Sequence, residues 1–328
     1  MRALEAARHE LEARAAAAPA PEVAALAERL ADAAGDSVRA VVFFGSRKTG
    51  AAASDAWSAF DLFVVTRAYR SFYDHLAAAG KLRRSPGLVA ALNAWLPPNQ
   101  ISFRAELEGR ALHAKCAVIA EPAFLRDTSP ARRDHFCAGR LFQPAEIVYA
   151  ADAAARAAVL SALASAQVVT LDWIRPWLPE RFDAEAYCRT LLDVSLSREI
   201  RPEPGGRADA LWAAQAAQLR PLYDRLLAAF AADGLLVATE DGRYALATPV
   251  TGAERRRVEW YFRRSLVRAT ARWAKYVLTF DDWLDYIVRK AERHGGRPIA
   301  LSARERRWPL VFLWPRVFRY LRDKDRPA

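Results

Sequence analysis

The first part of the chain alternates amphipathic stretches with short apolar runs, the pattern of helices that pack on a buried sheet. Residues 1–35 are rich in Ala at helical spacing and are interrupted near Pro19 and Pro21. Two runs rich in Val and Phe follow at 41–44 and 60–65. Runs of this length and composition predict buried strands, and the first of them ends at a Gly-Ser pair.

The pattern after the second strand predicts two helices and a β-hairpin. The expected helices cover 69–79 and 88–96, and the expected hairpin strands cover 101–107 and 112–119. Glu108 and Gly109 stand between those two strands, and a glycine in such a short connection is typical of a tight hairpin turn. We therefore expect strands and helices to share this part of the chain.

Helical spacing dominates the middle of the chain. We expect helix over 124–137 and then over most of 152–232, with interruptions at Pro176 and Pro179. Residues 233–251 carry repeated turn signals and indicate a linker or a small hairpin. Together these patterns predict an α+β fold, in which a mixed sheet flanked by helices precedes a helical region.

Basic and aromatic residues become dense after residue 252. Apolar side chains recur there at three- and four-residue spacing and share one face of an expected helix, with Arg and Lys over much of the remainder. The apolar stripe comprises Val258, Phe262, Leu266, Ala269, Trp273, Tyr276 and Phe280, and the basic positions are Arg256, Arg263, Arg264, Arg268, Arg272 and Lys275. A second helix is expected from 279–282 to Gly295, before an aromatic segment that starts at Trp308.

This C-terminal region is open to two interpretations. Trp and Tyr favour the headgroup zone of a bilayer, and each basic side chain near an anionic leaflet contributes about 1 kcal/mol. The segment therefore suits a helix that lies in the plane of an anionic membrane surface. Alternatively, the apolar stripe packs on the rest of the protein. No signature of an RNA-binding module is present, so the pattern favours a membrane over nucleic acid.

Composition restricts the class of protein. A chain of 328 residues with 53% hydrophobic residues can bury a full core, and its net charge of +11 predicts an anionic partner. The three cysteines (Cys116, Cys137 and Cys188) form no CxxC pair, which indicates buried free thiols. No apolar run approaches the roughly 18 residues that span a bilayer, and the N-terminus lacks the apolar core of a secretory signal. We expect a soluble or peripheral protein.

The most informative motif is the apolar strand that ends in Gly45-Ser46, with Asp61 on the next strand. A glycine there lets backbone N–H groups approach a phosphate closely, and the serine hydroxyl adds a donor. A carboxylate on the neighbouring strand can hold the Mg²⁺ that accompanies a nucleoside triphosphate. This pattern resembles the polymerase-β-like nucleotidyltransferases, although a Gly-Ser pair after a strand is also an ordinary turn.

The second acidic position of that superfamily is occupied by Phe63. Three explanations follow: another acid completes the metal site, only one metal ion is held tightly, or the enzyme is inactive. Glu106 and Glu108 are the candidates for the additional metal ligand, and Asp55 is a weaker one. Each glutamate would serve equally well as a solvated carboxylate at a strand edge.

Three further segments narrow the resemblance. Residues 108–119 (Glu-Gly-Arg, then Lys-Cys-Ala-Val-Ile) resemble the NGR…KYGVI strand pair of the Tam41-type phosphatidate cytidylyltransferases. Residues 136–144 (Phe-Cys-Ala-Gly-Arg-Leu-Phe-Gln-Pro) are similar to that family's LYLAGRLQKPV, and 195–201 are similar to its SYMGDIR. The segments occur in the family's order, and the resemblance covers about 38–235. That family also tends to carry a single Asp on the acidic strand.

The resemblance implies a Mg²⁺-dependent transfer of a cytidylyl group from CTP to phosphatidate, which gives CDP-diacylglycerol and pyrophosphate at a membrane surface. It implies a site on the cytoplasmic face of the inner membrane, reached as a peripheral protein. The implied domains are 1–150 for the catalytic domain with its N-terminal helices, 151–235 for a helical domain that completes the cleft, and 236–328 for the linker and membrane-contact helices.

The resemblance also implies roles for individual residues. The nucleotide-binding candidates are Gly45, Ser46, Arg47, Arg198 and Arg201; the Mg²⁺ ligands are Asp61 with Glu106 or Glu108; and the groups that cradle pyrophosphate or the acceptor phosphate are Lys115 and Arg140. Ordinary structural roles compete with these assignments. A lysine on a strand extends to solvent, and an arginine forms a structural salt bridge or a solvated helix charge.

The sequence departs from the family pattern at several positions. The family's Gly-Ser-Gly turn is Gly-Ser-Arg here, Gln143 replaces a lysine, and the family's segment rich in Trp, Asn and His is not recognisable in 67–100. These departures leave the acceptor open. The alternatives are a nucleotidyltransferase that acts on a sugar phosphate, a tRNA or a protein, and an inactive domain that serves as a membrane or nucleic-acid adaptor.

Overall fold

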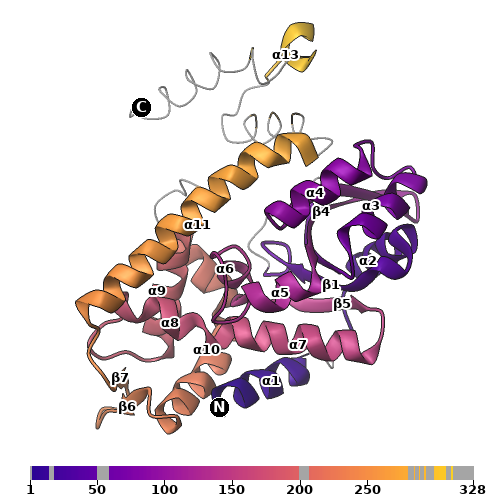
Figure 1. The fold of residues 1–328 in the computed structure, drawn as a ribbon. Helices are drawn as coiled ribbons and strands as arrows, with labels where there is room; N and C mark the ends of the chain where they lie inside the picture. The colour runs from indigo at the N-terminus through magenta and orange to yellow at the C-terminus, as the bar shows by residue number, and fades with distance from the viewer. Residues whose placement is uncertain are drawn as a thin grey trace. The chain divides into compact units, whose positions relative to one another are not determined.

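The computed structural model describes most of the chain (Figure 1). The described residues are 2–14, 18–49, 59–198 and 207–279, together with Leu284, Val288, Glu292, 299–307 and Phe312. They fall into two compact units, Met1–Thr279 and Phe280–Ala328. The fold is mixed α+β, with 59% helix and 17% strand. The domain boundaries expected at 150 and 235 both lie inside the first unit.

A five-stranded mixed sheet forms the centre of the first unit, with the strand order β3-β4-β2-β1-β5. Its strands are β1 (Val38–Phe44), β2 (Phe60–Thr66), β3 (Asn99–Leu107), β4 (Arg110–Ala120) and β5 (Glu146–Ala150). β2 and β4 run parallel, whereas the other neighbouring pairs are antiparallel. The two predicted buried strands and the predicted hairpin are confirmed. In the hairpin turn, Glu108 and Gly109 both have positive φ, 50° and 75°, as a tight two-residue turn requires.

Helices cover both faces of the sheet (Figure 1). On one face lie α2 (Pro21–Ala34), α3 (Tyr69–Ala78) and α4 (Pro86–Trp95); on the other lie α1 (Arg2–Arg14), α5 (Glu121–Asp127) and α7 (Ala153–Val168). The core between the sheet and α2, α3 and α4 is the first core, and the core on the opposite face is the second core. On β2, Leu62 belongs to the first core and Phe63 to the second. Because side chains alternate along a strand, Asp61 lies on the same face as Phe63.

The helices after β5 share the second core with the sheet. They include α8 (Thr170–Ile174), α9 (Ala184–Ser197) and α10 (Arg207–Ala232), preceded by the short α6 (Ala138–Leu141). One helical stretch, Ala153–Trp177, is long and apolar enough to cross a membrane by length and composition, but 67% of its apolar window is buried inside the fold. That burial is what the central helix of a packed domain requires.

The helix predicted over 124–137 is wrong after Asp127, where α5 ends. The hydroxyl of Thr128 donates to the Phe124 carbonyl at 3.0 Å, and the hydroxyl of Ser129 donates to the Arg126 carbonyl at 2.8 Å. Pro130 follows, and because a proline has no backbone N–H to donate to the Arg126 carbonyl, the helix cannot continue through it. The residues that follow form turns up to α6.

A small hairpin and a long helix complete the first unit. β6 (Leu236–Ala238) pairs with β7 (Tyr244–Leu246), so the segment at 233–251 contains a hairpin. α11 (Gly252–Thr279) then passes η2 (Arg175–Trp177), β3 and α4. In Figure 1 it runs diagonally along the body of this unit.

The amphipathic pattern predicted for α11 is correct only in its first half. Val258 and Phe262 are buried in the core, as expected. Farther along, Leu266 and Trp273 of the apolar stripe are 44% and 43% exposed. Arg272 and Lys275, which were expected on the outer face, are 2% and 3% exposed. The correction has a physical reason, because both cations find oxygen partners on the body of the protein.

Little of the second unit is described. α13 (Ala303–Arg307) begins with a reciprocal cap, in which the Ser302 backbone N–H donates to Glu305 Oε2 at 2.7 Å and the Glu305 N–H donates to the Ser302 hydroxyl at 3.3 Å. The second C-terminal helix expected from 279–282 and the aromatic segment from Trp308 lie almost entirely outside the described residues.

Candidate functional site

The bend after β1 holds a carboxylate directly against a glycine. Gly45 has a φ of 87°, in the left-handed region that glycine tolerates best. A Cβ atom at Gly45 would stand 2.5 Å from Oδ2 of Asp61, so only a residue without a side chain leaves room for that carboxylate. The backbone N–H groups of Lys48 and Thr49 donate to the Gly45 carbonyl at 3.0 and 3.2 Å, which closes one helix-like turn. The structure thus places Asp61 beside the Gly45-Ser46 bend, as the sequence led us to expect.

Lys115 stands beside Asp61 on the next strand. The two residues are Cα partners in the parallel register of β2 and β4, where neighbouring strands lie about 4.8 Å apart. Lys115 is half-buried and, by strand alternation, lies on the same sheet face as Asp61. The structure therefore brings together three groups predicted from sequence: the bend, the carboxylate and this lysine.

Arg47 is directed elsewhere. Its guanidinium lies 3.7 Å from the centroid of the Phe60 ring and 3.7 Å from Glu22 on α2. Phe60 belongs to the core on the opposite face of the sheet from Asp61. Lys48, the next residue, pairs with Glu146 on β5. These contacts of Arg47 are with groups other than the Asp61 carboxylate, and its role in nucleotide binding stays a prediction.

The two glutamates predicted as additional metal ligands lie far from Asp61. Ser102 is the β3 residue opposite Lys115, so Glu106 is four residues farther along the strand, about 13 Å away along its axis. Glu108 lies beyond it in the hairpin turn. No group of three or more His, Cys, Asp or Glu side chains that could hold a metal ion occurs among the residues that the structure describes. Asp55 lies outside those residues.

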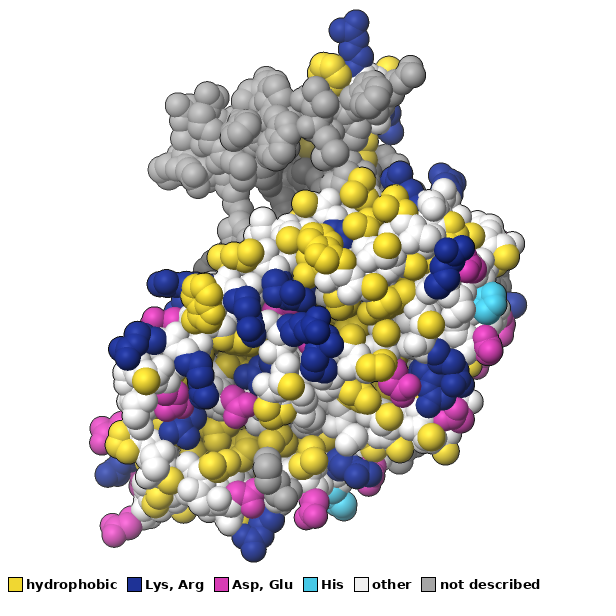
Figure 2. Space-filling view, in the orientation of Figure 1, with side chains coloured by type: hydrophobic (Ala, Val, Ile, Leu, Met, Phe, Trp, Pro, Cys, Tyr) yellow, Lys and Arg dark blue, Asp and Glu magenta, His cyan; other side chains and the backbone are white. Residues whose placement is uncertain are grey.

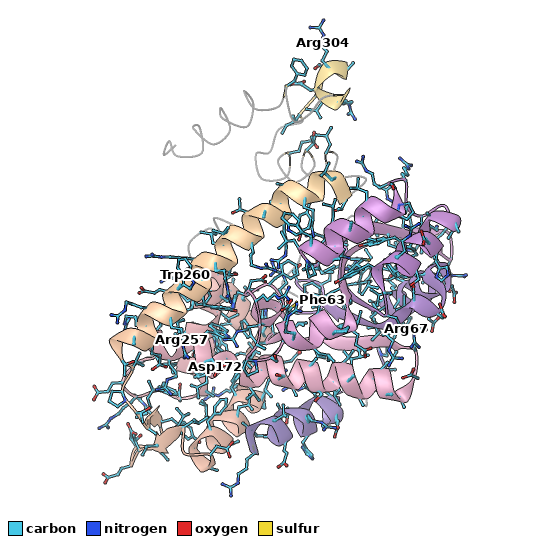
Figure 3. All side chains as sticks on the ribbon, in the orientation of Figure 1. Phe63, Arg67, Asp172, Arg257, Trp260 and Arg304 are labelled. Carbon is cyan, nitrogen blue, oxygen red and sulfur yellow. The ribbon has the colours of Figure 1, made fainter. Side chains whose placement is uncertain are left out.

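Phe63 occupies the position on β2 where the superfamily pattern has a second carboxylate. Its side chain is fully buried and contacts the rings of Phe44, Phe124 and Phe136 at centroid distances of 4.7, 5.8 and 5.9 Å. Figure 3 shows Phe63 in the region between α11 and α5. An aromatic cluster therefore lies two residues along β2 from Asp61, where a charged side chain would have to be buried.

Phe136 connects this cluster to Arg140. The Arg140 guanidinium lies 4.1 Å from the centroid of the Phe136 ring, and its Nη1 donates to the Phe136 carbonyl at 3.0 Å. Because the same ring touches Phe63, Arg140 lies close to the strand that carries Asp61. A helical turn thus holds Arg140 against the aromatic cluster, and its role as a phosphate ligand stays a prediction.

Two of the segments that carried the family resemblance, 136–144 and the described part of 195–201, meet at Gly139. A Cβ atom on Gly139 would stand 2.5 Å from Cδ2 of His135 and 3.2 Å from the Ser195 hydroxyl. Nε2 of His135 lies 3.1 Å from that hydroxyl, and Nδ1 lies 3.2 Å from the hydroxyl of Tyr261. The glycine of the Ala-Gly-Arg motif is therefore required by close packing against an imidazole.

His135 was not among the residues predicted to matter. Burial, with the nearby cations Arg132 and Arg140 acting in the same direction, lowers its pKa to about 3. The imidazole is therefore neutral at physiological pH and joins three segments through hydrogen bonds. Its signal in the sequence is its position immediately before the Phe-Cys-Ala-Gly-Arg motif, but spacing alone does not reveal that its ring packs on the glycine.

The remaining candidates lie on or after α9. Arg198 follows the last residue of α9, and its guanidinium lies 5.2 Å from the centroid of the Trp177 ring. This contact places it against the helical part of the unit and not beside Asp61. Arg201 lies outside the described residues.

α11 contributes buried cations that were predicted to face a membrane. Nε of Arg268 and Nη2 of Arg272 both donate to Oδ2 of Asp134, at 2.6 and 2.5 Å. The Asp134 carboxyl is buried, but these two arginines hold its pKa below the ordinary value. Asp134 was not predicted from the sequence, because it belongs to no recognised motif.

Lys275 fixes the end of α4. Its ammonium donates to the carbonyls of Pro98 at 3.1 Å and Leu92 at 3.4 Å, and also to that of Leu96. Carbonyls at a helix C-terminus carry partial negative charge, so a cation is favourable there. Burial lowers the pKa of Lys275 to about 7, and the nearby Arg272 and Arg268 act in the same direction.

Comparison with known proteins adds no assignment. No protein-family model matches the chain, and no curated protein matches it significantly.

The packing at Gly139 makes a prediction about stability. Gly139→Ala should lower the free energy of unfolding by about 1–3 kcal/mol, because the added methyl group overlaps the His135 ring. Thermal and denaturant unfolding of the full chain would measure the change.

Gly87→Ala is the matched control. A Cβ there meets only the flexible end of Arg70, at 3.2 Å, and replacing a helical glycine by alanine typically stabilises by about 0.5–1 kcal/mol. If Gly139→Ala also raised stability, the glycine would not be a packing requirement and this interpretation of the motif would be wrong.

Proposed function

We propose that this protein is a nucleotidyltransferase that transfers a cytidylyl group from CTP to phosphatidate. The observation that carries the proposal is the contact between the Asp61 carboxylate and Gly45 at the end of β1. Lys115 stands beside that carboxylate, and Arg140 lies near the same strand. A glycine bend, a carboxylate and two cations on one face of a sheet suit the binding of a nucleotide with its metal ion.

The residues fit a magnesium ion that arrives with its nucleotide. Mg²⁺ is usually bound through one or two carboxylates together with substrate phosphates, and not in a cage made only of protein ligands. Asp61 supplies one such carboxylate, and the part of the chain that the structure describes contains no acidic cluster that would hold an ion alone. When bound, the ion would neutralise phosphate charge and polarise the reacting phosphoryl group.

The protein's own part in the reaction is to position two anions. An oxygen of the phosphatidate phosphate forms a bond to the α-phosphorus of CTP, and the bond from that phosphorus to the pyrophosphate oxygen breaks. The attacking phosphate has a second pKa of about 6, so it is ionised at neutral pH and requires no general base. The backbone N–H groups of Gly45 and Ser46 are suited to the triphosphate, and Lys115 and Arg140 offset the repulsion between the substrates.

A lipid acceptor is supported by the outer surface of α4 and α11. Trp95 at the end of α4 is 67% exposed, and Trp273, Leu278 and Val267 of α11 are also exposed. Lys275 binds carbonyls at the end of α4, which keeps Trp95 close to the last turns of α11. Figure 2 shows hydrophobic side chains gathered over α4. Such a surface suits the headgroup zone of a membrane.

Asp61→Asn tests the reaction. The full chain should convert CTP and phosphatidate to CDP-diacylglycerol with Mg²⁺, and the variant should lose at least about 100-fold in turnover, because the amide is a poor metal ligand of almost the same shape. Product formation from labelled CTP measures this, and an unchanged unfolding midpoint shows that the fold is intact.

Asp209→Asn is the control, since Asp209 is an exposed carboxylate on α10 whose loss leaves turnover unchanged. If CTP is consumed only with a sugar phosphate, a tRNA or a protein, that molecule would replace phosphatidate as the proposed acceptor. Full activity of Asp61→Asn would remove the basis of the metal assignment.

The membrane surface generates a separate prediction. The double variant Trp95→Ser with Trp273→Ser should partition onto anionic phospholipid vesicles at least about tenfold more weakly than the wild type, since two aromatic side chains lose their apolar contact. Co-sedimentation with vesicles that contain phosphatidate measures the partition.

Val237→Ser provides the matched control, because Val237 is 53% exposed on the distant β6–β7 hairpin. Equal sedimentation of the double variant and the wild type would show that this surface does not contact lipid.

A further inference from the structure

α11 places more positive charge inside the protein than the neighbouring carboxylate balances. Arg268 and Arg272 share the single carboxylate of Asp134, and both donate to the same oxygen, Oδ2. Asp134 and Arg272 have side chains that are only 1% and 2% exposed. A buried charge is costly unless it is paired and fully hydrogen-bonded. Two guanidiniums on one carboxylate leave a net positive charge.

Two nitrogens of this pair lack a hydrogen-bond partner. Nη2 of Arg268 and Nη1 of Arg272 are buried and donate to no oxygen of the described residues, although Nε of Arg272 donates to the Pro97 carbonyl at 2.8 Å. A guanidinium carries five N–H donors, and an unsatisfied buried donor on a charged group costs more than a neutral one. The cluster therefore has both unbalanced charge and unused donors, which an additional anion would satisfy.

A third guanidinium, that of Arg140, lies near the same aromatic ring as that of Arg272. The Phe136 ring has the Arg272 guanidinium 5.1 Å from its centroid and the Arg140 guanidinium 4.1 Å from it. The ring also contacts Phe63, two residues along β2 from Asp61. Arg140 and Arg272 thus share one aromatic ring, and Arg268 joins Arg272 through Asp134.

The cluster has access to solvent at one residue. The Arg268 side chain is 22% exposed, in contrast to the buried Arg272. Figure 2 shows Lys and Arg side chains gathered on the surface between α11 and α5. An anion can therefore approach from this side, and a modest rotation of Arg268 would turn its unpartnered nitrogen toward it.

We propose that Arg268, Arg272 and Arg140 form a binding site for a phosphate monoester. This proposal rests on the proposed function. The arginine cluster binds the phosphate of the acceptor, whereas the Gly45-Ser46 bend receives the triphosphate. The ligand class follows from the donors, because planar guanidiniums bind phosphate oxygens in pairs. A phosphate monoester near neutral pH carries nearly two negative charges, which offsets the excess charge of the cluster.

Binding of inorganic phosphate to the full chain tests the site without any turnover. At constant ionic strength set with chloride, phosphate should raise the thermal unfolding midpoint of the wild type in a saturable manner. Arg268→Gln should weaken this binding at least tenfold. Arg272→Lys, which keeps a cation for Asp134 but lacks the planar fork, should weaken it as well.

Two further variants separate a binding site from a structural link. Arg257→Gln removes an exposed charge on the same helix (Figure 3) and should leave phosphate binding unchanged. Asp134→Asn removes the competing anion, so it should tighten phosphate binding even though it destabilises the protein. A purely structural Arg–Asp–Arg link predicts no saturable effect of phosphate on the wild type, and that result would overturn the proposal.

Turnover with a soluble short-chain phosphatidate separates this inference from the proposed function. Arg268→Gln should raise the KM for phosphatidate at least tenfold and leave the KM for CTP unchanged, with inorganic phosphate competing against phosphatidate in the wild type. Saturable phosphate binding that Arg268→Gln abolishes, in a protein without cytidylyl turnover, would support the site and refute the function. Turnover with an unchanged KM for phosphatidate in Arg268→Gln would refute the site and support the function. Binding of pyrophosphate but not of phosphate monoesters would also refute the proposed phosphate-monoester site.

Discussion

The contact between the Asp61 carboxylate and Gly45 is the constraint on which the proposed site depends. Two requirements coincide at residue 45. The backbone there has a positive φ, and the space that a Cβ would fill is already occupied by a carboxylate oxygen. The antiparallel register of β1 and β2 makes the contact possible, because Phe44 and Asp61 are direct partners. The parallel register of β2 and β4 places Lys115 on the other side of Asp61, because these two residues are also direct partners.

The second organising feature is α11, whose buried face is apolar in its first turns and basic in its last turns. The first turns of α11 bury Val258 and Phe262, whereas its last turns bury Arg272 and Lys275 and expose Trp273 and Leu278. Oxygen partners make this arrangement stable: Asp134 and the Pro97 carbonyl for Arg272, and the carbonyls at the end of α4 for Lys275. The reversal leaves apolar side chains outside and cations inside, which connects the proposed lipid surface to the proposed phosphate site.

Local pattern was sufficient for much of the sheet. The run at 41–44 is apolar throughout, and the run at 60–65 is apolar except for Asp61. The Glu108-Gly109 pair has the composition of a tight turn, so strands and hairpin were predicted correctly. β5 was not predicted, because its five residues carry no regular alternation and pair only through β1. The helix expected over 124–137 was wrong after Asp127, because Pro130 lies three residues farther along and has no backbone N–H for another helical turn.

The candidate site was predictable where it depends on strand neighbours and not where it depends on long-range packing. Asp61 and Lys115 follow from the motif and the sheet, whereas the glutamates of the hairpin lie too far along β3 to join them. Asp134 binds Arg268 and Arg272, which lie on a helix more than 100 residues later in the chain. An amphipathic pattern cannot show which face of that helix finds hydrogen-bond partners. The packing of His135 on Gly139 is of the same kind.

The most direct measurement is a crystal structure of the full chain with Mg²⁺ and a non-hydrolysable CTP analogue. Our account predicts that the triphosphate accepts hydrogen bonds from the backbone of Gly45 and Ser46 and that a cation links it to the Asp61 carboxylate. A triphosphate bound at any other place, with Asp61 still packed on Gly45 and no cation beside it, would contradict the account.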